Sequence, residues 1–170
     1  HVFHLDVPMY HKVLLLTDAA LNLAPDLAEK ADILQNAIEL AQILGIVEPK
    51  VALLAAVENV NPRMPATLDA AALCKMAERG QIKGALLDGP LAFDNAISSR
   101  AAEIKGIDSP VAGDPDILLA PNLEAANMMA KQFEYSAGAA AAGIVLGARV
   151  PIALTSRADE AATRVASAAL

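Results

Sequence analysis

The sequence predicts an α/β protein, a three-layer α/β/α sandwich around a mainly parallel sheet. Short, continuous apolar runs alternate along the chain with longer segments of helical periodicity. Runs without polar alternation are typical of strands that are covered on both faces, and strands joined by whole helices are expected to be parallel. The chain has 170 residues and is 55% apolar but only 3% aromatic, so aliphatic side chains and alanine must fill its core.

The expected elements follow one another without a low-complexity linker. The predicted strands occupy the apolar runs at 1–8, 12–20, 49–57, 83–90 and 115–122, with one or two more in 142–157 around a turn near 147–151. The predicted helices occupy 24–45, 66–80, 94–106, 123–140 and 158–170. In the first helix, Asp26 and Glu29 suit the positive amino end, and Gly45 stops the periodic pattern. Thr67 is expected to cap the second helix.

Composition excludes several classes of protein. The formal net charge is −7 and no basic residues cluster, so a nucleic-acid partner is not expected. No apolar run approaches the roughly 18 residues that a membrane helix needs. A single cysteine, Cys74, allows no internal disulfide and favours a cytoplasmic location. Cys74 falls on an apolar helix face, which favours a core thiol over a reactive one.

Polar side chains follow the predicted strands at their carboxyl ends. Asp18 and Asn22 stand at the end of the strand predicted at 12–20, and further tips are Glu58 with Asn59, Asp88 with Gly89, Asn122 with Asn127, and Thr155 with Ser156 and Arg157. Ligands of open parallel sheets bind outside the carboxyl ends of strands, so we expect these tips to meet at one edge. For each tip alone, helix capping or solvation is the favoured explanation. Together the tips indicate a ligand site without naming the ligand.

Arg157 is the strongest single signal for an anion. A guanidinium is a forked donor that suits phosphate or carboxylate, and here it stands beside two hydroxyl groups at the start of a helix. The alternative is a surface pair with Asp159. His1, His4 and His11 lie close together in the chain, but no acidic or sulfur ligands stand at a metal-binding spacing. A metal site is therefore not predicted.

Lys131 and Tyr135 share a helix face, and we interpret both as solvent contacts. Glycine-rich phosphate loops and the nucleophile elbow of α/β hydrolases are absent from the chain.

Three stretches resemble the phosphate acetyltransferase and phosphate butyryltransferase family, particularly its butyryltransferase-like branch. They are DGPLAFDNAIS at 88–98, SPVAGDPDILLAPNLEAAN at 109–127 and VPIALTSRAD at 150–159, and the likeness extends over nearly the whole chain. The resemblance implies an isocitrate dehydrogenase-like α/β/α fold, in two domains with the active site in the cleft between them. It implies transfer of a short acyl group between coenzyme A and inorganic phosphate, both as substrates, with no cofactor or metal. It also implies a homo-oligomer, a dimer or larger.

The resemblance assigns roles to individual residues. Ser156 and Arg157 match the family's serine–arginine pair and would be catalytic: Arg157 would hold phosphate or the thioester oxygen, and Ser156 would donate to the transition state or the leaving sulfur. The positions matching the substrate-binding cleft are Asp18, Asn22, Asp88, Asp94, Asn127 and Thr155.

The chain also departs from the family pattern. An acidic residue is expected near position 163, where this chain has Thr163, so Asp159 is the nearest candidate base. Asn122 and Ala126 stand where the family usually has aspartate and glycine.

Length suggests that the chain is the second domain of such an enzyme, because family members are much longer. Residues 1–150 would form this domain, and 151–170 would be a segment that returns to a first domain preceding His1. The principal hypothesis is therefore a phosphate acyltransferase. The alternatives are an inactive fragment that binds coenzyme A or an anion, and a part with a structural role only.

Overall fold

The computed structural model describes all 170 residues and contains one seven-stranded sheet. The strands are β1 (Val2–Asp6), β2 (Leu14–Thr17), β3 (Lys50–Leu54), β4 (Leu86–Leu91), β5 (Ile117–Leu119), β6 (Ala140–Val145) and β7 (Ile152–Ala153). Their spatial order is β4-β3-β5-β2-β1-β6-β7. The pairs among β4, β3, β5 and β2 are parallel, and the pairs β2–β1, β1–β6 and β6–β7 are antiparallel. Strand direction reverses at β1 and again at β6, so five of the seven strands point the same way and the sheet is mainly parallel, as predicted.

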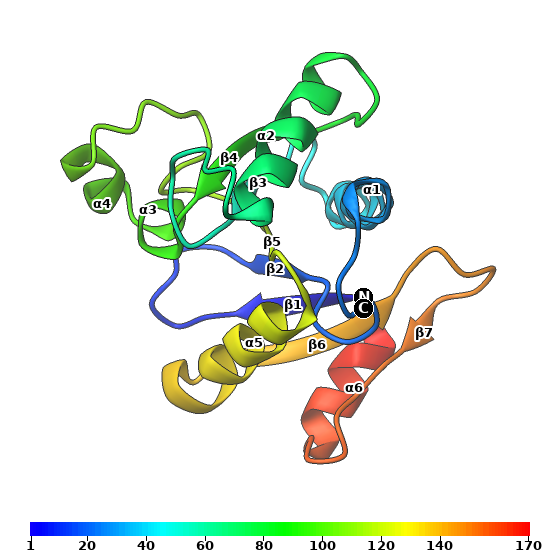
Figure 1. The fold of residues 1–170 in the computed structure, drawn as a ribbon. Helices are drawn as coiled ribbons and strands as arrows, with labels where there is room; N and C mark the ends of the chain where they lie inside the picture. Colours follow the sequence, from blue (N-terminus) through cyan, green and yellow to red (C-terminus); the bar gives the residue numbers. More distant parts are fainter.

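Helices cover both faces of this sheet (Figure 1). The helices are α1 (Leu27–Ile43), α2 (Pro65–Glu78), α3 (Phe93–Ile97), α4 (Ser99–Ile104), α5 (Leu123–Ala137) and α6 (Ala161–Ala169). One buried cluster joins α1 and α2 to the sheet through side chains such as Leu34, Leu73 and Leu119. A second cluster joins α3 and α5 to the opposite face through Ala96 and Phe133. The predicted three-layer α/β/α architecture is therefore confirmed.

Local side-chain hydrogen bonds and proline explain where the helices α1 and α2 begin. Asp26 caps α1 and forms a capping box with Glu29, in which each side chain accepts from the other residue's backbone N–H. Thr67 does not cap α2, because the helix begins earlier, at Pro65 after Met64. The Thr67 hydroxyl instead accepts from the Asn61 N–H at 2.9 Å and fixes the preceding loop. The proline at the first helical position was the better boundary signal.

The segment 94–106, predicted as one helix, forms two. Ser98 has extended backbone angles (φ −125°, ψ 111°) and separates α3 from α4. Its hydroxyl accepts a hydrogen bond from the Ala101 N–H at 3.3 Å, so it caps α4. A serine that can bond to the local backbone competes with helix continuation, which explains the break.

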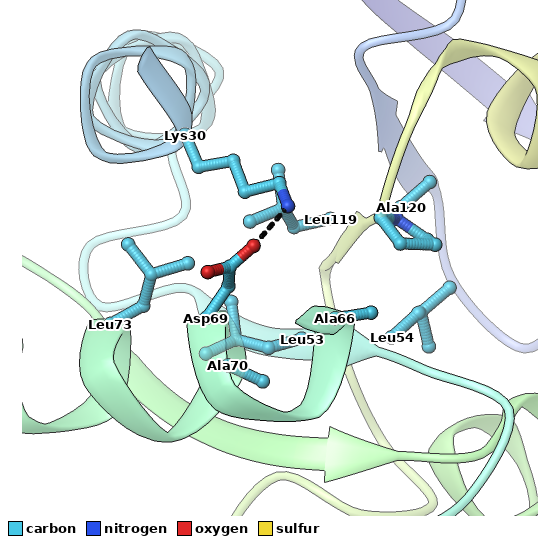
Figure 2. A pocket seen from close by; sticks show the side chains of 10 residues that line it. Lys30, Leu53, Leu54, Ala66, Asp69, Ala70, Leu73, Leu119 and Ala120 are labelled. Carbon is cyan, nitrogen blue, oxygen red and sulfur yellow. Dashed lines mark hydrogen bonds and ion pairs between the residues drawn. The ribbon is translucent and has the colours of Figure 1, made fainter. Parts of the chain in front are cut away.

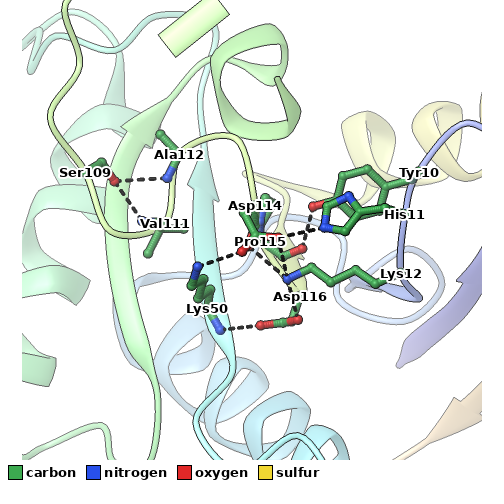
Figure 3. Close-up of polar contacts among 10 residues, drawn as sticks. All are labelled: Tyr10, His11, Lys12, Lys50, Ser109, Val111, Ala112, Asp114, Pro115 and Asp116. Carbon is green, nitrogen blue, oxygen red and sulfur yellow. Dashed lines mark hydrogen bonds and ion pairs between the residues drawn. The ribbon is translucent and has the colours of Figure 1, made fainter. Parts of the chain in front are cut away.

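An ion-pair network holds the amino ends of the central strands together (Figure 3). Asp114, just before β5, lies 2.9 Å from Lys12 Nζ and 2.6 Å from Lys50 Nζ, next to the starts of β2 and β3. Asp116 lies 2.7 Å from Lys12 Nζ and also accepts the Lys50 backbone N–H. The polar side chains at this edge are thus paired with one another.

The carboxyl-terminal segment, residues 151–170, packs on this same sheet. β7 pairs with β6 only briefly, and the Leu154 N–H donates to the Gly143 carbonyl at 3.1 Å. An antiparallel pair would exchange a second hydrogen bond, but the Gly143 N–H donates to Ser167 Oγ of α6 at 3.0 Å. A Cβ on Gly143 would lie 2.6 Å from the Leu154 carbonyl oxygen. The glycine therefore lets the chain leave the ladder and cross over β6. Contact of this segment with a first domain stays a prediction.

Candidate functional site

A cavity of about 260 Å³ lies on the α5 face of the sheet, between α5 and the chain that leaves β7. Its polar lining residues are His1, Asn127, Lys131, Thr155 and Ser156. Its apolar lining consists of Phe3, Ala19, Ala20, Leu123 and Leu154. The cavity thus gathers hydroxyl, amide, ammonium and imidazole groups from three separate parts of the chain.

Thr155 and Ser156 reach this cavity because the chain crosses β6 at Gly143. A tight turn then fixes Ser156: its backbone N–H donates to the Asp159 carboxylate at 2.6 Å, and its Oγ accepts from the Ala158 N–H at 3.3 Å. The Ser156 carbonyl accepts from the Asp159 N–H at 3.2 Å. The Asp159 carboxylate and the Ser156 hydroxyl both stabilise the turn, so Ser156 lies at a defined place on the cavity wall.

Asn127 and Asp18 connect the other wall to the end of β2. Asn127 Nδ2 donates to the Ala19 carbonyl at 3.1 Å. Asp18 is buried and accepts from the backbone N–H groups of Ala20 and Leu21 and from Asn22 Nδ2 at 2.5 Å. Burial alone would raise the pKa of the Asp18 carboxyl, but these hydrogen bonds and the amino-terminal ammonium group 3.5 Å away outweigh it and hold the pKa below its ordinary value. Asp18 therefore stays ionised and orders the loop that forms the cavity wall.

Lys131 brings a positive charge to the cavity. It lies four residues after Asn127 on α5 and so occupies the same helix face. Its Nζ lies 2.7 Å from the Glu134 carboxylate and 5.8 Å from the centre of the Tyr135 ring. Its side chain lines the cavity with the hydroxyl groups of Thr155 and Ser156. The interpretation of Lys131 as a solvent contact missed this placement.

A protein-family model described as "Phosphate acetyl/butaryl transferase" matches residues 1–170, the whole chain. The chain belongs to this family.

Curated members of the family cover this chain completely but are longer. The phosphate acetyltransferase of Rhizobium meliloti is 61% identical over 170 residues, which are 54% of its own length. The probable phosphate butyryltransferase of Bacillus subtilis (strain 168) is 52% identical over 170 residues, 57% of its length. The chain therefore spans about half the length of the curated relatives it matches. Relatives of both names match, so the butyryltransferase-like branch stays a prediction.

Solved structures of phosphotransacylases share the fold. A branched-chain phosphotransacylase from Enterococcus faecalis V583 superposes with a TM-score of 0.90 at 37% identity, covering 99% of this chain and 60% of that one. A phosphotransacetylase from Streptococcus pyogenes gives a TM-score of 0.84 at 29% identity, covering 98% and 50%. This chain thus has the same fold as about half of a phosphotransacylase.

The predicted meeting of all strand ends holds only in part for this family member. β2, β3, β4 and β5 are parallel and share one carboxyl edge. β7 is antiparallel to β6, so Thr155 and Ser156 do not extend from that edge and reach the cavity only by crossing β6. The sequence pattern shows where strands end but not the direction in which a hairpin returns.

Two predicted substrate-binding residues lie away from this cavity. Asp88 lies within β4 rather than after it, and its carboxylate accepts from the Gly89 N–H at 2.9 Å. β4 and β7 are opposite edges of the sheet, about 29 Å apart at the usual spacing of about 4.8 Å between strands. Asp94 is exposed on α3 and pairs with Lys105 at 3.0 Å, which lowers the pKa of the carboxyl. Within this chain neither residue joins Ser156.

Arg157 is exposed, one position beyond the cavity lining. It forms no ion pair, and the Asp159 carboxylate binds the Ser156 N–H instead of the guanidinium. The alternative of an Arg157–Asp159 surface pair is therefore wrong. The arginine remains free to contact a bound anion.

Two other cavities fit a charged substrate poorly. The space beneath the Lys30–Asp69 ion pair, which joins α1 to α2 at 2.6 Å, measures about 10 Å³, the size of one water molecule (Figure 2). A cavity of about 450 Å³ beside Phe93, Met129 and Phe133 is almost wholly apolar. No group of three or more histidine, cysteine, aspartate or glutamate side chains is arranged to hold a metal, and no helix is long and apolar enough to span a membrane.

Proposed function

We propose that this chain is the serine-bearing half of a phosphate acyltransferase, which transfers a short acyl group between coenzyme A and inorganic phosphate. The observation that carries the proposal is the convergence of Ser156, Thr155, Asn127 and Lys131 on one cavity in a member of this family. The chain has a net charge of −7, so an anionic substrate needs local donors of this kind.

In the proposed reaction an oxygen of the hydrogen phosphate dianion attacks the thioester carbonyl carbon of acyl-coenzyme A. A carbon–oxygen bond forms, the carbon–sulfur bond breaks with its electron pair on sulfur, and the phosphate proton ends on the thiol. The products are an acyl phosphate and free coenzyme A, so no metal or prosthetic group is required.

Negative charge grows on the carbonyl oxygen and then on sulfur, and fixed donors at those positions lower the barrier. Ser156 would donate to this charge, and Lys131 and Arg157 would hold phosphate against the carbonyl. Asp159 would act through the Ser156 turn rather than as a base, since its carboxylate already accepts the Ser156 N–H.

Thiol release tests this proposal directly. The chain is mixed with acetyl-, propionyl- or butyryl-coenzyme A, with and without phosphate, and free thiol is followed by colour. We expect phosphate-dependent release that falls about a hundredfold or more in Ser156→Ala and Arg157→Ala. Ser136→Ala and Arg149→Ala are matched controls, because both residues are exposed and lie outside the cavity. Unchanged turnover in the two site variants would contradict the assignment.

A second candidate function is binding of coenzyme A without catalysis. The length of the chain favours it, because the relatives have about as much chain again, which would complete a cleft. Saturable coenzyme A binding by calorimetry without thiol release, even in the presence of phosphate, would identify this function. Release would exclude it.

We further propose a cytoplasmic homo-oligomer, a dimer or larger. The lone Cys74 supports a reducing compartment. Exposed apolar side chains beside β7 and on α6, such as Val150 (64% exposed) and Val165 (69%), support a further interface. Sedimentation velocity of the chain would report its oligomeric state.

A further inference from the structure

His1 has a buried side chain with unused hydrogen-bonding capacity. The residue is 7% exposed, and neither ring nitrogen has a hydrogen-bond partner in the structure. A neutral imidazole carries one donor and one acceptor, and leaving such groups buried and unpaired costs free energy. The ring therefore has hydrogen-bonding capacity that no group of this chain uses.

The surrounding fold places this ring at the candidate site. It packs edge-on against Phe3, with ring centroids 4.6 Å apart, and it lines the same cavity as Ser156 and Lys131. A Cβ on Gly143 would lie 2.9 Å from His1 Nε2, so the glycine leaves room for the ring as well as for the Leu154 carbonyl. The absence of a side chain at 143 thus seats His1 beneath the crossing chain.

Donors outnumber free acceptors around the ring. Lys131, Asn127 and the hydroxyl groups of Thr155 and Ser156 line the cavity. The nearby carboxylates are already occupied: Asp18 accepts from Asn22 and from backbone N–H groups, Asp159 from Ser156, and Glu134 from Lys131. A ligand with several anionic oxygens is the chemistry that satisfies this set.

We propose that His1 is a substrate-binding residue whose imidazole donates a hydrogen bond to a phosphoryl oxygen bound in this cavity. The proposal rests on the function proposed above and adds a contact that the serine–arginine pair does not include. The phosphoryl group belongs either to inorganic phosphate or to coenzyme A, and the two are separated by titrating each alone.

The first experiment follows the histidine ring nitrogens by long-range ¹H–¹⁵N NMR. The chain has three histidines, so the His1 signals are those that vanish in His1→Phe. Phosphate is titrated at constant ionic strength against chloride, and coenzyme A is titrated separately. We expect a saturable change at the His1 ring, and the ligand that produces it names the source of the phosphoryl group.

The second experiment measures affinity. His1→Phe keeps the packing against Phe3 but removes both nitrogens, and we expect phosphoryl binding to weaken about tenfold. His1→Asn retains an N–H donor and should lose less. His4→Phe is the matched control, because His4 lies in β1, three residues after His1, and the strand alternation places it on the opposite face. Thermal unfolding of each variant shows that the fold is retained.

The outcomes separate this proposal from the proposed function. A saturable change at His1 without thiol release would support the contact and contradict the reaction. Phosphate-dependent release with an unchanged KM for phosphate in His1→Phe and no change at the His1 ring would overturn the contact and leave the reaction standing. No saturable effect of either ligand on the ring would also overturn the contact.

Discussion

Lys131 carries the charge at the proposed site. Burial alone would lower the pKa of its ammonium group, but the hydrogen bond with Glu134 outweighs burial and raises the pKa above its ordinary value. The side chain therefore stays protonated across the physiological range. A permanent cation beside two hydroxyl groups is what phosphate binding requires in a chain of net charge −7.

Replacing Lys131 should weaken anion binding. We expect Lys131→Gln to reduce affinity for phosphate about threefold or more, because the side chain is partly exposed and its charge is partly screened. Phosphate titration followed by calorimetry measures this change. Lys75→Gln is the matched control, since Lys75 also pairs with a glutamate three residues later, on the distant α2. Equal losses in the two variants would show that Lys131 acts only through net charge.

Asp114 sets the acid limit of stability. Burial would raise the pKa of its carboxyl, but hydrogen bonds from Lys50, Lys12 and His11 outweigh burial and hold the pKa well below its usual range. A carboxyl with a depressed folded-state pKa stabilises the fold above its unfolded pKa of about 3.9. That contribution is lost as the pH falls through the folded-state value.

We expect Asp114→Asn to lower the free energy of unfolding at pH 7 by about 1 kcal/mol, a figure reduced for the 42% exposure of the side chain. The difference between variant and parent should shrink as the pH falls below about 4. Urea unfolding at a series of pH values measures both effects. Asp108→Asn, at an exposed residue outside the network, should change neither. A difference that is constant with pH would contradict the role of the charge.

At the scale of elements, the connection between β7 and α6 determines the site. β7 leaves the sheet after a two-residue strand, and the Ser167 hydroxyl occupies the Gly143 N–H that β7 gives up. The crossing depends on the absence of a side chain at Gly143. The Leu154 carbonyl and the His1 ring both lie close to the space that a Cβ there would fill.

Gly143→Ala should therefore destabilise the protein by about 1–3 kcal/mol. Backbone propensity alone predicts the opposite sign, since alanine in a strand is favoured over glycine by about 0.5–1 kcal/mol. Urea unfolding gives the sign, and hydrogen exchange at the Leu154 amide reports whether the crossing has loosened. Ala142→Gly, at the buried neighbour on the other face, should lose stability through propensity and the lost methyl group but keep the Leu154 amide protected. A Gly143→Ala protein more stable than the parent would contradict the close approach.

Periodicity and turn residues were enough to predict nearly every element. The apolar runs gave the strands, and Gly45 and Gly80 marked the helix ends correctly. The single helix predicted over 94–106 was wrong because the Ser98 hydroxyl accepts from the Ala101 N–H and starts a second helix. The predicted Thr67 cap of α2 was wrong because the Thr67 hydroxyl bonds to the Asn61 N–H of the preceding loop. The alternative hydrogen-bonding arrangements differ in free energy by about 1 kcal/mol, and hydrophobic periodicity does not predict which one forms.

The order of the strands in the sheet is a property of the whole molecule and cannot be predicted from local sequence pattern. Asn127, Thr155 and Ser156 were predicted for the site and line one cavity, and Asp18 orders the loop that forms part of its wall. Asp88 does not join them, because β4 is the opposite edge. The helical spacing of Lys131 to Asn127 was a usable signal for the missed cation, whereas His1 carried none.

α6 is only partly covered by the rest of this chain. It buries Ser167 but leaves Val165 69% exposed, so one of its apolar sides has no partner within this chain. When the chain is joined to the additional half that its relatives possess, we expect the amides of α6 to exchange at least about tenfold more slowly. Hydrogen exchange of the two forms measures this, with the β3 amides as the internal control. Equal rates would contradict the prediction that 151–170 returns to a first domain.

The partly buried position of Cys74 has a practical consequence for the thiol-release assay. Burial, together with the nearby Asp88 and Glu78 charges, raises the pKa of its thiol to about 11. Disulfide reagents react with thiolates, and at neutral pH almost none of this thiol is in that form. The protein therefore contributes almost no colour of its own while it stays folded. Any signal developed during an assay comes from coenzyme A, and a slow extra equivalent per chain would report unfolding.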